Sequence, residues 1–451
     1  MSVTFQGISA QTILYTMPEE LGLHEGTWLQ WPHNFTYPPY WREDLEPTWI
    51  EMTSELQAGE KVHIIAYNSE EKDHIVQVLT TAGVPLTNVD FYIHPNNDVW
   101  VRDNGPIFVF DNDGYMKILD WGFNGWGEDA PYTLCDAIPQ LVSEDIDIPY
   151  VDLSAMVLEG GSMELDGNGT LMATKSSIIN PNRNPLLSQA QIEEIMTMNL
   201  GVTNFIWLDG VAGLEITDMH IDGFARFHNS TTIVTMDSID LIYWEVPAAD
   251  ISILYNAQNI DGDPYNYLYL PLTANDVVTT YGQNLGYKGS YVNYYIGNTV
   301  VLVPIYDDPN DAVAISILQT IYPTRTVVGI DVRNLYSGGG MIHCVTQQQP
   351  YYEVPTGNIE KKNSSVKLMQ NIPNPFGDST IISFSLKKES KAKLEVYNLQ
   401  GQKLVTLIDS KLSAGEHSIT LMADEYENGI YTYILTIDES ISVSKKMIVA
   451  R

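Results

Sequence analysis

The feature that most limits the fold of this chain is an alternation of strand-like and helix-like segments. Residues 61–67 form a β-rich run, residues 70–79 have helical apolar spacing, and residues 89–93 are typical of the next strand. Ser69 is the expected N-cap of this helix and Gly83 its stop signal. A second unit of the same kind is expected over residues 298–304, 311–320 and 326–330. Repeated units predict an α/β architecture, and their periodicity leaves both a wound sheet and a closed ring open.

The pattern changes after residue 350. A chain of 451 residues exceeds the size at which one hydrophobic core usually keeps growing, so more than one domain is expected. Residues 357–366 are a polar linker, and no helical period is evident from Lys367 onward. The alternating runs there are residues 380–386, 392–397, 403–407, 417–421, 429–436 and 442–449. Their spacing predicts a small antiparallel β-sandwich of about 85 residues.

The charge of the chain limits its partners. Lys and Arg number 23 against 57 Asp and Glu, which gives a net charge of −34. Such a surface repels nucleic acid and anionic membranes, and it attracts small cations. A general adaptation of solubility to a salty medium explains the same charge. No segment reaches the roughly 18 to 20 consecutive apolar residues of a membrane-spanning helix.

The chain has only two cysteines, Cys135 and Cys344. This number excludes a disulfide-rich scaffold and a multi-cysteine zinc cage. Cys135 is expected to be a small buried core residue. Cys344 follows three glycines, Met341, Ile342 and a histidine, where a reactive thiol is more plausible than a disulfide partner.

Four short motifs carry groups suited to one active site. They contain Asp103, Glu159, the pair His220 and Asp222, and Cys344. Each group lies beside glycines or a turn residue. Together, a thiol, an imidazole and three carboxylates can bind a planar cation and attack its carbon with sulfur. The natural substrate for such a set is a guanidinium.

Taken singly, these residues have plainer interpretations. Asp103 precedes Asn-Gly and suits a turn, and Glu159 precedes Gly-Gly and suits the surface. On an alternating segment, His220 and Asp222 would face the same side, whereas His343 would point away from Cys344 and is given no role. The spacing lacks the paired ligands of a tetrahedral zinc site, so no metal is predicted.

The glycines before Cys344 do not indicate a nucleotide site. The run from Gly338 to Gly340 lacks the Lys and Ser or Thr that follow in a phosphate-binding loop. No cofactor is therefore predicted.

The motifs resemble those of the agmatine deiminase and bacterial peptidylarginine deiminase family of guanidine-modifying enzymes. Further similar stretches are residues 17–34, 123–127, 180–185, 290–296 and 344–350. The resemblance covers most of residues 14–350. It implies a five-bladed α/β propeller, the pentein fold, over residues 11–356, with the active site on the propeller axis.

The resemblance also implies a role for each residue of the site. Asp103 and Asp222 would bind the guanidinium nitrogens. Cys344 would be the nucleophile that forms a covalent thiouronium intermediate. His220 would transfer protons, and Glu159 would orient His220.

The substrate implied is agmatine, which would be hydrolysed to N-carbamoylputrescine and ammonia. The residues around Cys344 are more similar to agmatine deiminases, and Trp126 and Asp98 are candidate lining residues for the agmatine tail. Leu21 replaces a usual tryptophan, which favours the alternative of a secreted peptidylarginine deiminase. A non-catalytic surface binding protein is a third possibility, and the complete set of five catalytic residues argues against it.

The C-terminal residues resemble the sorting domain of the type IX secretion system. The similar pieces are residues 371–376, 396–401, 412–417, 428–431 and 445–451. This resemblance implies an immunoglobulin-like sandwich over residues 367–451, recognition by the type IX machinery, and a secreted or cell-surface location. The alternative is a mere accessory sandwich. Residues 1–10 are typical of the end of a secretory signal, so the mature protein is expected to begin near Gln11.

Overall fold

The computed structural model of the protein describes residues 13–36, 40–353, 366–369, 371, 373–374, 376–386, 388–398, 403–426, 429–437 and 441–449. The chain divides into two compact units, Met1–Tyr352 and Glu353–Arg451. The expected signal remnant and all of the expected linker except Val366 lie outside the described residues. No helix in the described ranges has both the length and the apolar character needed to cross a bilayer.

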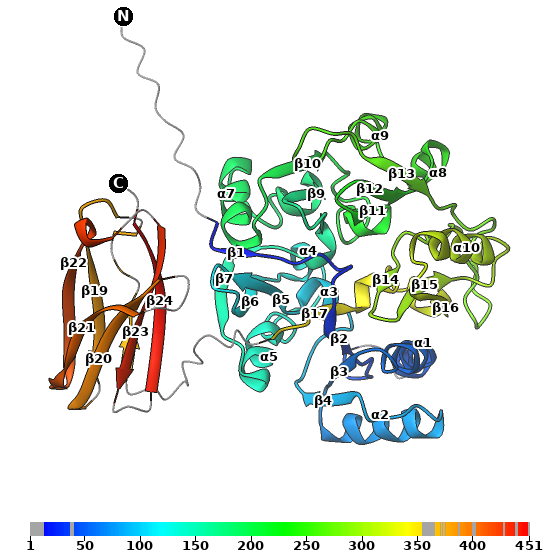
Figure 1. The fold of residues 1–451 in the computed structure, drawn as a ribbon. Coiled ribbons are helices and arrows are strands. Elements are labelled where there is room, and N and C mark those ends of the chain that lie inside the picture. Colours follow the sequence, from blue (N-terminus) through cyan, green and yellow to red (C-terminus); the bar gives the residue numbers. More distant parts are fainter. Residues whose placement is uncertain are drawn as a thin grey trace, which may run out of the picture. The chain divides into compact units, whose positions relative to one another are not determined.

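The described strands of the first unit form five small sheets (Figure 1). The first contains β1 (Tyr15–Thr16), β5 (Ile107–Asp111), β6 (Met116–Gly122) and β7 (Tyr150–Val157). The second contains β8 (Met163–Leu165), β9 (Thr170–Thr174) and β10 (Asn204–Leu208). The third contains β11 (Ala225–Asn229), β12 (Thr232–Thr235) and β13 (Asn266–Tyr269). The fourth contains β14 (Tyr295–Ile296), β15 (Val300–Ile305) and β16 (Thr326–Asp331).

The fifth sheet joins the two ends of this unit. It contains β17 (Gln347–Pro350), β2 (His24–Gln30), β3 (Lys61–Ala66) and β4 (Val89–Ile93), in that order. Strand β17 runs antiparallel to β2, with Gln347 opposite Trp28. The indole of Trp28 donates a hydrogen bond of 2.9 Å to the side chain of Gln349. The residues that follow the Cys344 motif are therefore fixed against the N-terminal part of the chain.

Helices accompany the sheets. The longer ones are α1 (Trp41–Leu56), α2 (Ser69–Thr81), α5 (Ile138–Ile146), α7 (Gln189–Leu200), α8 (Ser238–Tyr243), α9 (Ala248–Tyr255) and α10 (Asp311–Ile321). The single-turn helices are α3 (Val101–Asn104), α4 (Gly125–Glu128), α6 (Lys175–Ile178) and α11 (Arg333–Tyr336). Two of these single-turn helices, α3 and α4, carry Asp103 and Trp126 of the site described below.

The two strand–helix–strand units predicted from the sequence are confirmed. They are β3–α2–β4 and β15–α10–β16, and the strand pairs β3–β4 and β15–β16 are parallel. The predicted N-cap was wrong by one residue. Asn68 caps α2, because its side-chain oxygen accepts a hydrogen bond from the backbone N–H of Glu71 and Ser69 is already helical.

The second unit consists of two antiparallel sheets. One contains β18 (Val366–Leu368), β19 (Ser379–Leu386) and β22 (Gly415–Met422). The other contains β21 (Lys403–Leu412), β20 (Ser390–Tyr397), β23 (Gly429–Ile437) and β24 (Ile441–Val449). Phe384 of the first sheet and Leu394 and Leu435 of the second belong to one buried cluster. The strand pattern predicted from the sequence is thus confirmed, with β18 as an additional strand.

Candidate active site

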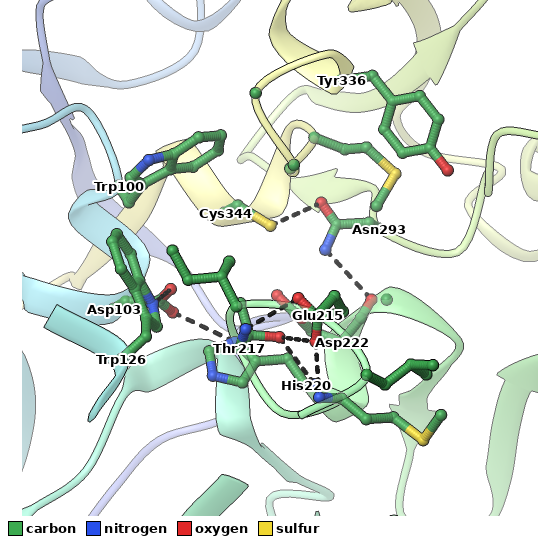
Figure 2. Close-up of a pocket in the computed structure, with 18 of the residues that line it drawn as sticks. Trp100, Asp103, Trp126, Glu215, Thr217, His220, Asp222, Asn293, Tyr336 and Cys344 are labelled. Carbon is green, nitrogen blue, oxygen red and sulfur yellow. Dashed lines mark hydrogen bonds and ion pairs between the residues drawn. The ribbon is translucent and has the colours of Figure 1, made fainter. Parts of the chain in front are cut away.

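A cavity of about 1020 Å³ in the first unit collects nearly all of the predicted site residues. Those that line it are Asp98, Asp103, Trp126, His220, Asp222 and Cys344. Glu159 lies behind His220 and is almost completely buried. Figure 2 shows Asp103, His220 and Asp222 on one side of this cavity and Cys344 across from them.

The groups come from short turns between the regular elements. Asp103 lies in α3, Glu159 directly precedes the turn η1 (Gly160–Ser162), and Cys344 lies in the turn η3 (His343–Val345). The expectation that His220 and Asp222 lie on an extended segment was wrong. They belong to the turn η2 (Ile221–Gly223) and its N-cap, which follows two residues with positive φ, and both side chains still line the cavity.

Gly161 marks the point at which three of the groups converge. A Cβ atom at this position would lie 2.8 Å from Asp103 Oδ1, 2.8 Å from His220 Nδ1 and 3.1 Å from Asp222 Oδ2. Glycine leaves this space open, and its own N–H donates a hydrogen bond of 3.0 Å to Asp103 Oδ1. Any side chain here would therefore displace at least one of the three groups.

Asp103 is held by two N–H donors. Besides Gly161, the indole of Trp126 donates to Asp103 Oδ2 at 2.9 Å. Burial raises the pKa of Asp103 to about 6, and the negative charges of Glu159 and Asp222 contribute to the rise, while protonated His220 opposes it. A cation that enters the cavity would favour the ionised carboxylate. Asp103 is thus positioned and charged for a cationic ligand.

His220 lies between carboxylates. Its Nε2 is 2.8 Å from Glu159 Oε2, and its Nδ1 is 3.6 Å from Asp103 Oδ1. Burial alone would lower the pKa of His220, but Asp103, Glu159 and Asp222 together raise it to about 9. The imidazole therefore carries a proton at neutral pH and can donate it.

Cys344 lies opposite these groups and is partly buried. Its sulfur is 3.5 Å from Asn293 Oδ1, and Asn293 Nδ2 donates to the backbone carbonyl of Asp222 at 3.2 Å. Burial raises the pKa of the Cys344 thiol well above its usual value, and the charges of Asp222 and Asp103 raise it further. The same carboxylates would be neutralised by a cationic ligand, which would make the thiolate easier to form.

The sequence of the first unit is similar to that of a known enzyme family. Residues 16–350 match the model of the Porphyromonas-type peptidyl-arginine deiminase family. The chain belongs to this family. Residues 371–450 match the secretion system C-terminal sorting domain.

One sequence relative and two solved structures are similar to this chain over about three quarters of its length. The agmatine deiminase of Stutzerimonas stutzeri is 32% identical over 358 residues, which cover 74% of this chain and 95% of that protein. The solved agmatine deiminase of Enterococcus faecalis is 28% identical, with a TM-score of 0.66, and the match covers 74% of this chain and 96% of that one. A solved Campylobacter jejuni agmatine deiminase variant with substrate bound is 25% identical, with a TM-score of 0.64 and coverage of 78% and 99%. The first unit thus has the α/β fold of these deiminases.

In this deiminase-family chain, the orientation of the His343 side chain differs from the sequence prediction. His343 was given no role because an extended backbone would point it away from Cys344. The backbone instead forms the 3-10 turn η3, and His343 Nδ1 and Nε2 lie 2.7 Å from Asp222 Oδ2 and 2.8 Å from Glu20 Oε2. Burial opposes ionisation of Asp222, but its hydrogen bond and attraction to His343 hold its pKa below the usual value. His343 therefore supports the carboxylate of Asp222, which lines the same cavity as Cys344.

Glu20 was missed by sequence reasoning. Its carboxylate meets His343, Arg226 at 3.0 Å and Arg102 at 3.4 Å. Burial would raise the pKa of Glu20, but Arg226, His343 and Arg102 hold it well below its usual value. The only signal in the sequence was its place within the stretch of residues 17–34. In this deiminase family member, that stretch supplies the anchor behind the site.

The remaining wall of the cavity is acidic and aromatic. Its lining also includes the carboxylates of Asp98, Asp129, Glu215 and Glu245, together with Lys288. The carboxylate of Asp98 accepts a hydrogen bond from the backbone N–H of Val99 at 2.8 Å. Across the described residues, no group of three or more His, Cys, Asp or Glu side chains is arranged to hold a metal ion.

Proposed function

We propose that the first unit is an agmatine deiminase that hydrolyses agmatine to N-carbamoylputrescine and ammonia. The observation that carries this proposal is the convergence of Asp103, His220 and Asp222 at Gly161, in the same cavity as the Cys344 thiol. Family membership and relatives named agmatine deiminase support the reaction class, a hydrolysis of a guanidine C–N bond. The reaction needs water as its second substrate and uses protein side chains alone.

The two aspartates would hold the substrate. Asp103 and Asp222 can each accept hydrogen bonds from the N–H groups of a guanidinium, and such charge-assisted bonds are stronger than neutral ones. Trp126 is already bonded to Asp103, so we assign it to the guanidinium end of the cavity rather than to the tail. Fixing the planar cation between two carboxylates would leave its central carbon facing Cys344.

Cys344 would supply the nucleophile. The positive charge of the bound guanidinium favours loss of the thiol proton to solvent, and the sulfur then forms a bond to the guanidinium carbon. The tetrahedral adduct breaks one C–N bond and releases ammonia, which leaves an S-alkylthiouronium. Water adds to the same carbon, the C–S bond breaks, and the ureido product leaves with the thiolate restored.

His220 would handle the protons of both halves of the reaction. In the first half it gives its proton to the departing nitrogen, which leaves as ammonia. In the second half it accepts a proton from the attacking water, which returns it to its starting state. Glu159, at 2.8 Å from the imidazole, would keep the ring oriented and charged.

The acidic wall supports agmatine over peptide-bound arginine. Agmatine ends in an ammonium, which carboxylates attract, whereas the backbone of an arginine peptide offers no cation there. The tail would face four carboxylates, those of Asp98, Asp129, Glu215 and Glu245. Lys288 also lines the cavity, and its ammonium nitrogen lies 5.3 Å from the centre of the Tyr243 ring. The acidity of the chain as a whole would also attract this dication.

Peptidylarginine deimination is the second candidate. It is favoured by the family description itself and by the sorting domain, which indicates export and a secreted or cell-surface location. An exported enzyme meets peptides and proteins outside the cell. The type IX secretion machinery is then a partner of the second unit with either substrate, and we expect no partnership with nucleic acid.

We further propose the finer organisation of the chain. The five small sheets of the first unit would be the blades of an α/β propeller around the site. Residues 11–356 would form this domain, residues 357–366 the linker, and residues 367–451 an immunoglobulin-like sorting domain. The division into two compact units and the two separate family matches support these boundaries.

The proposal is tested by ammonia release from agmatine, free arginine and an arginine peptide. We expect turnover of agmatine by the wild-type protein, none by Cys344→Ala, and retained agmatine binding by the variant in calorimetry. Cys135→Ala is the matched control, because Cys135 is the other cysteine and is buried in the core. Turnover by Cys344→Ala would refute the mechanism, and preference for the peptide would establish the second candidate.

A further inference from the structure

The turn at residues 180–184 holds a completely buried arginine behind the site. The side chain of Arg183 has no exposed surface and lies between two carboxylates. Its Nε is 2.7 Å from Glu159 Oε1, and its Nη1 is 2.6 Å from Asp218 Oδ2. A buried guanidinium with two acid partners is costly to assemble unless every group is paired, so the contact is specific.

Glu159 is shared between this arginine and the catalytic imidazole. Glu159 Oε1 accepts a hydrogen bond from Arg183 Nε, while Glu159 Oε2 meets both His220 Nε2 at 2.8 Å and Arg183 Nη2 at 3.4 Å. The buried chain of contacts therefore runs from His220 through Glu159 and Arg183 to Asp218. Arg183 does not line the cavity, so it can act on the reaction only through these partners.

At its other end, Arg183 holds part of the cavity wall. Asp218 has a positive φ of 59°, which is strained for a residue other than glycine, and its second oxygen accepts a hydrogen bond from the backbone N–H of Gly213. Asn182 also donates to Asp218, at 2.9 Å. The segment from residue 214 to residue 217, enclosed by these bonds, lines the cavity (Figure 2).

The same turn supports the loop of Trp126. A Cβ atom at Gly127, whose φ is 92°, would lie 2.7 Å from Asn182 Nδ2 and 3.0 Å from Arg183 Nη1. Asn124 donates a hydrogen bond of 2.9 Å to the backbone carbonyl of Asn182. The turn is therefore in contact with the supports of both His220 and Asp103.

We propose that Arg183 is a positioning residue that tunes the proton transfers of His220 through Glu159 and holds the wall of residues 214–217 through Asp218. The inference deepens the proposed deiminase function and depends on it. Its basis is the shared carboxylate of Glu159, together with complete burial of the Arg183 side chain.

The electrostatic effect has a definite sign. The charged groups around His220 are Asp103, Glu159 and Asp222, with Arg183 behind Glu159, and the thiol of Cys344 lies across the cavity. Arg183 is a cation near an imidazolium, so it opposes protonation of the ring. It also offsets part of the negative charge of Glu159, which favours the protonated ring. Without Arg183, His220 would hold its proton more tightly and would transfer it to the departing nitrogen more slowly.

The test uses the full-length protein and the pH profile of agmatine turnover. For Arg183→Gln we expect kcat to fall about 100-fold and the alkaline limb to move up by about one pH unit. Arg183→Lys keeps the charge and should leave the limb near its wild-type position. Asp218→Asn keeps the pair of Arg183 with Glu159, so it should raise KM about tenfold without moving the limb.

Asn184→Ala is the matched control for damage to the turn. It removes hydrogen bonds to the backbone carbonyls of Val157 and Ile178 but none to Glu159, so its pH profile should keep the wild-type limb. The proposal would be overturned if the alkaline limb of the Arg183→Gln pH profile lay at the same pH as that of this control. If Arg183→Gln does not fold, Arg183→Lys and Asp218→Asn decide, and a shifted limb in Asp218→Asn would overturn it. An inactive wild-type protein would instead refute the proposed function.

Discussion

The hydrogen bond from Trp126 to Asp103 gives a prediction with a magnitude that can be worked out. Trp126→Phe removes an N–H donor 2.9 Å from a buried carboxylate, while the ring that packs edge-on against Phe123 is largely retained. A hydrogen bond to a charged group contributes about 1.5–3 kcal/mol. Because one pKa unit corresponds to about 1.4 kcal/mol, the pKa of Asp103 should rise by roughly one to two units.

The consequence is a shift of the acid limb of the pH profile. Asp103 has a pKa raised to about 6, and a guanidinium is bound best by its ionised form. In Trp126→Phe, the half-ionisation point moves to roughly pH 7–8, so kcat/KM near neutral pH should fall by about two- to tenfold. The deficit should shrink as the pH rises, since the carboxylate is then ionised in both proteins.

Ammonia release from agmatine, measured as kcat/KM across the pH range, tests this reasoning. Trp121→Phe is the matched control, because the buried indole N–H of Trp121 has no hydrogen-bond partner among the described residues. The control should keep the wild-type acid limb. An unchanged limb in Trp126→Phe, with the protein folded, would show that Trp126 does not set the charge of Asp103.

Three further predictions follow from the same structure. Glu20→Gln should lower the free energy of unfolding by about 1.5–3 kcal/mol, because it removes one of the two carboxylates that pair with buried Arg226 and leaves only Glu164. The pKa of Glu20 is depressed in the folded state. The ionised carboxylate therefore stabilises the fold at pH values above the ordinary pKa of a glutamate, and this stabilisation is lost as the pH falls through the lower folded pKa. Thermal melts in which the variant keeps this pH dependence would contradict the assignment. His343→Asn should raise KM for agmatine about tenfold by releasing Asp222, and steady-state kinetics with an unchanged KM would count against this support. Deletion of residues 353–451 should leave agmatine turnover intact and abolish export in a host with type IX secretion, and fractionation that still finds the truncated protein outside the cell would argue against the sorting role.

Periodicity predicted the regular elements well, because their apolar spacing is local. The helix from Ser69 to Thr81 and its two flanking strands needed only residues within that stretch. The cap was misplaced because both Asn68 and Ser69 are good capping residues, and the backbone of Asn68 decided between them. Such choices depend on one pair of dihedral angles, which a single sequence does not specify.

Six of the predicted site residues line one cavity, whereas the residues that support them were missed. Cys344 and Asp103 were found because each lies in a recognisable motif. Glu20, by contrast, meets His343 across 323 residues of chain, and its neighbours in the sequence do not reveal this contact. His343 was misjudged because its orientation depends on a tight turn that the strand periodicity of the surrounding segment does not indicate.

Because β17 pairs with β2, the position of the Cys344 turn depends on a contact between the two ends of the first unit. The side chains of Trp28 and Gln349 meet although they lie 321 residues apart, and β17 begins only three residues after Cys344. Contacts at such separations form slowly, because closing so long a loop costs conformational entropy before the contact can compensate it. A chain still emerging from the ribosome lacks the β17–β2 pairing, so the turn that carries Cys344 becomes fixed only after β17 has been synthesised and paired.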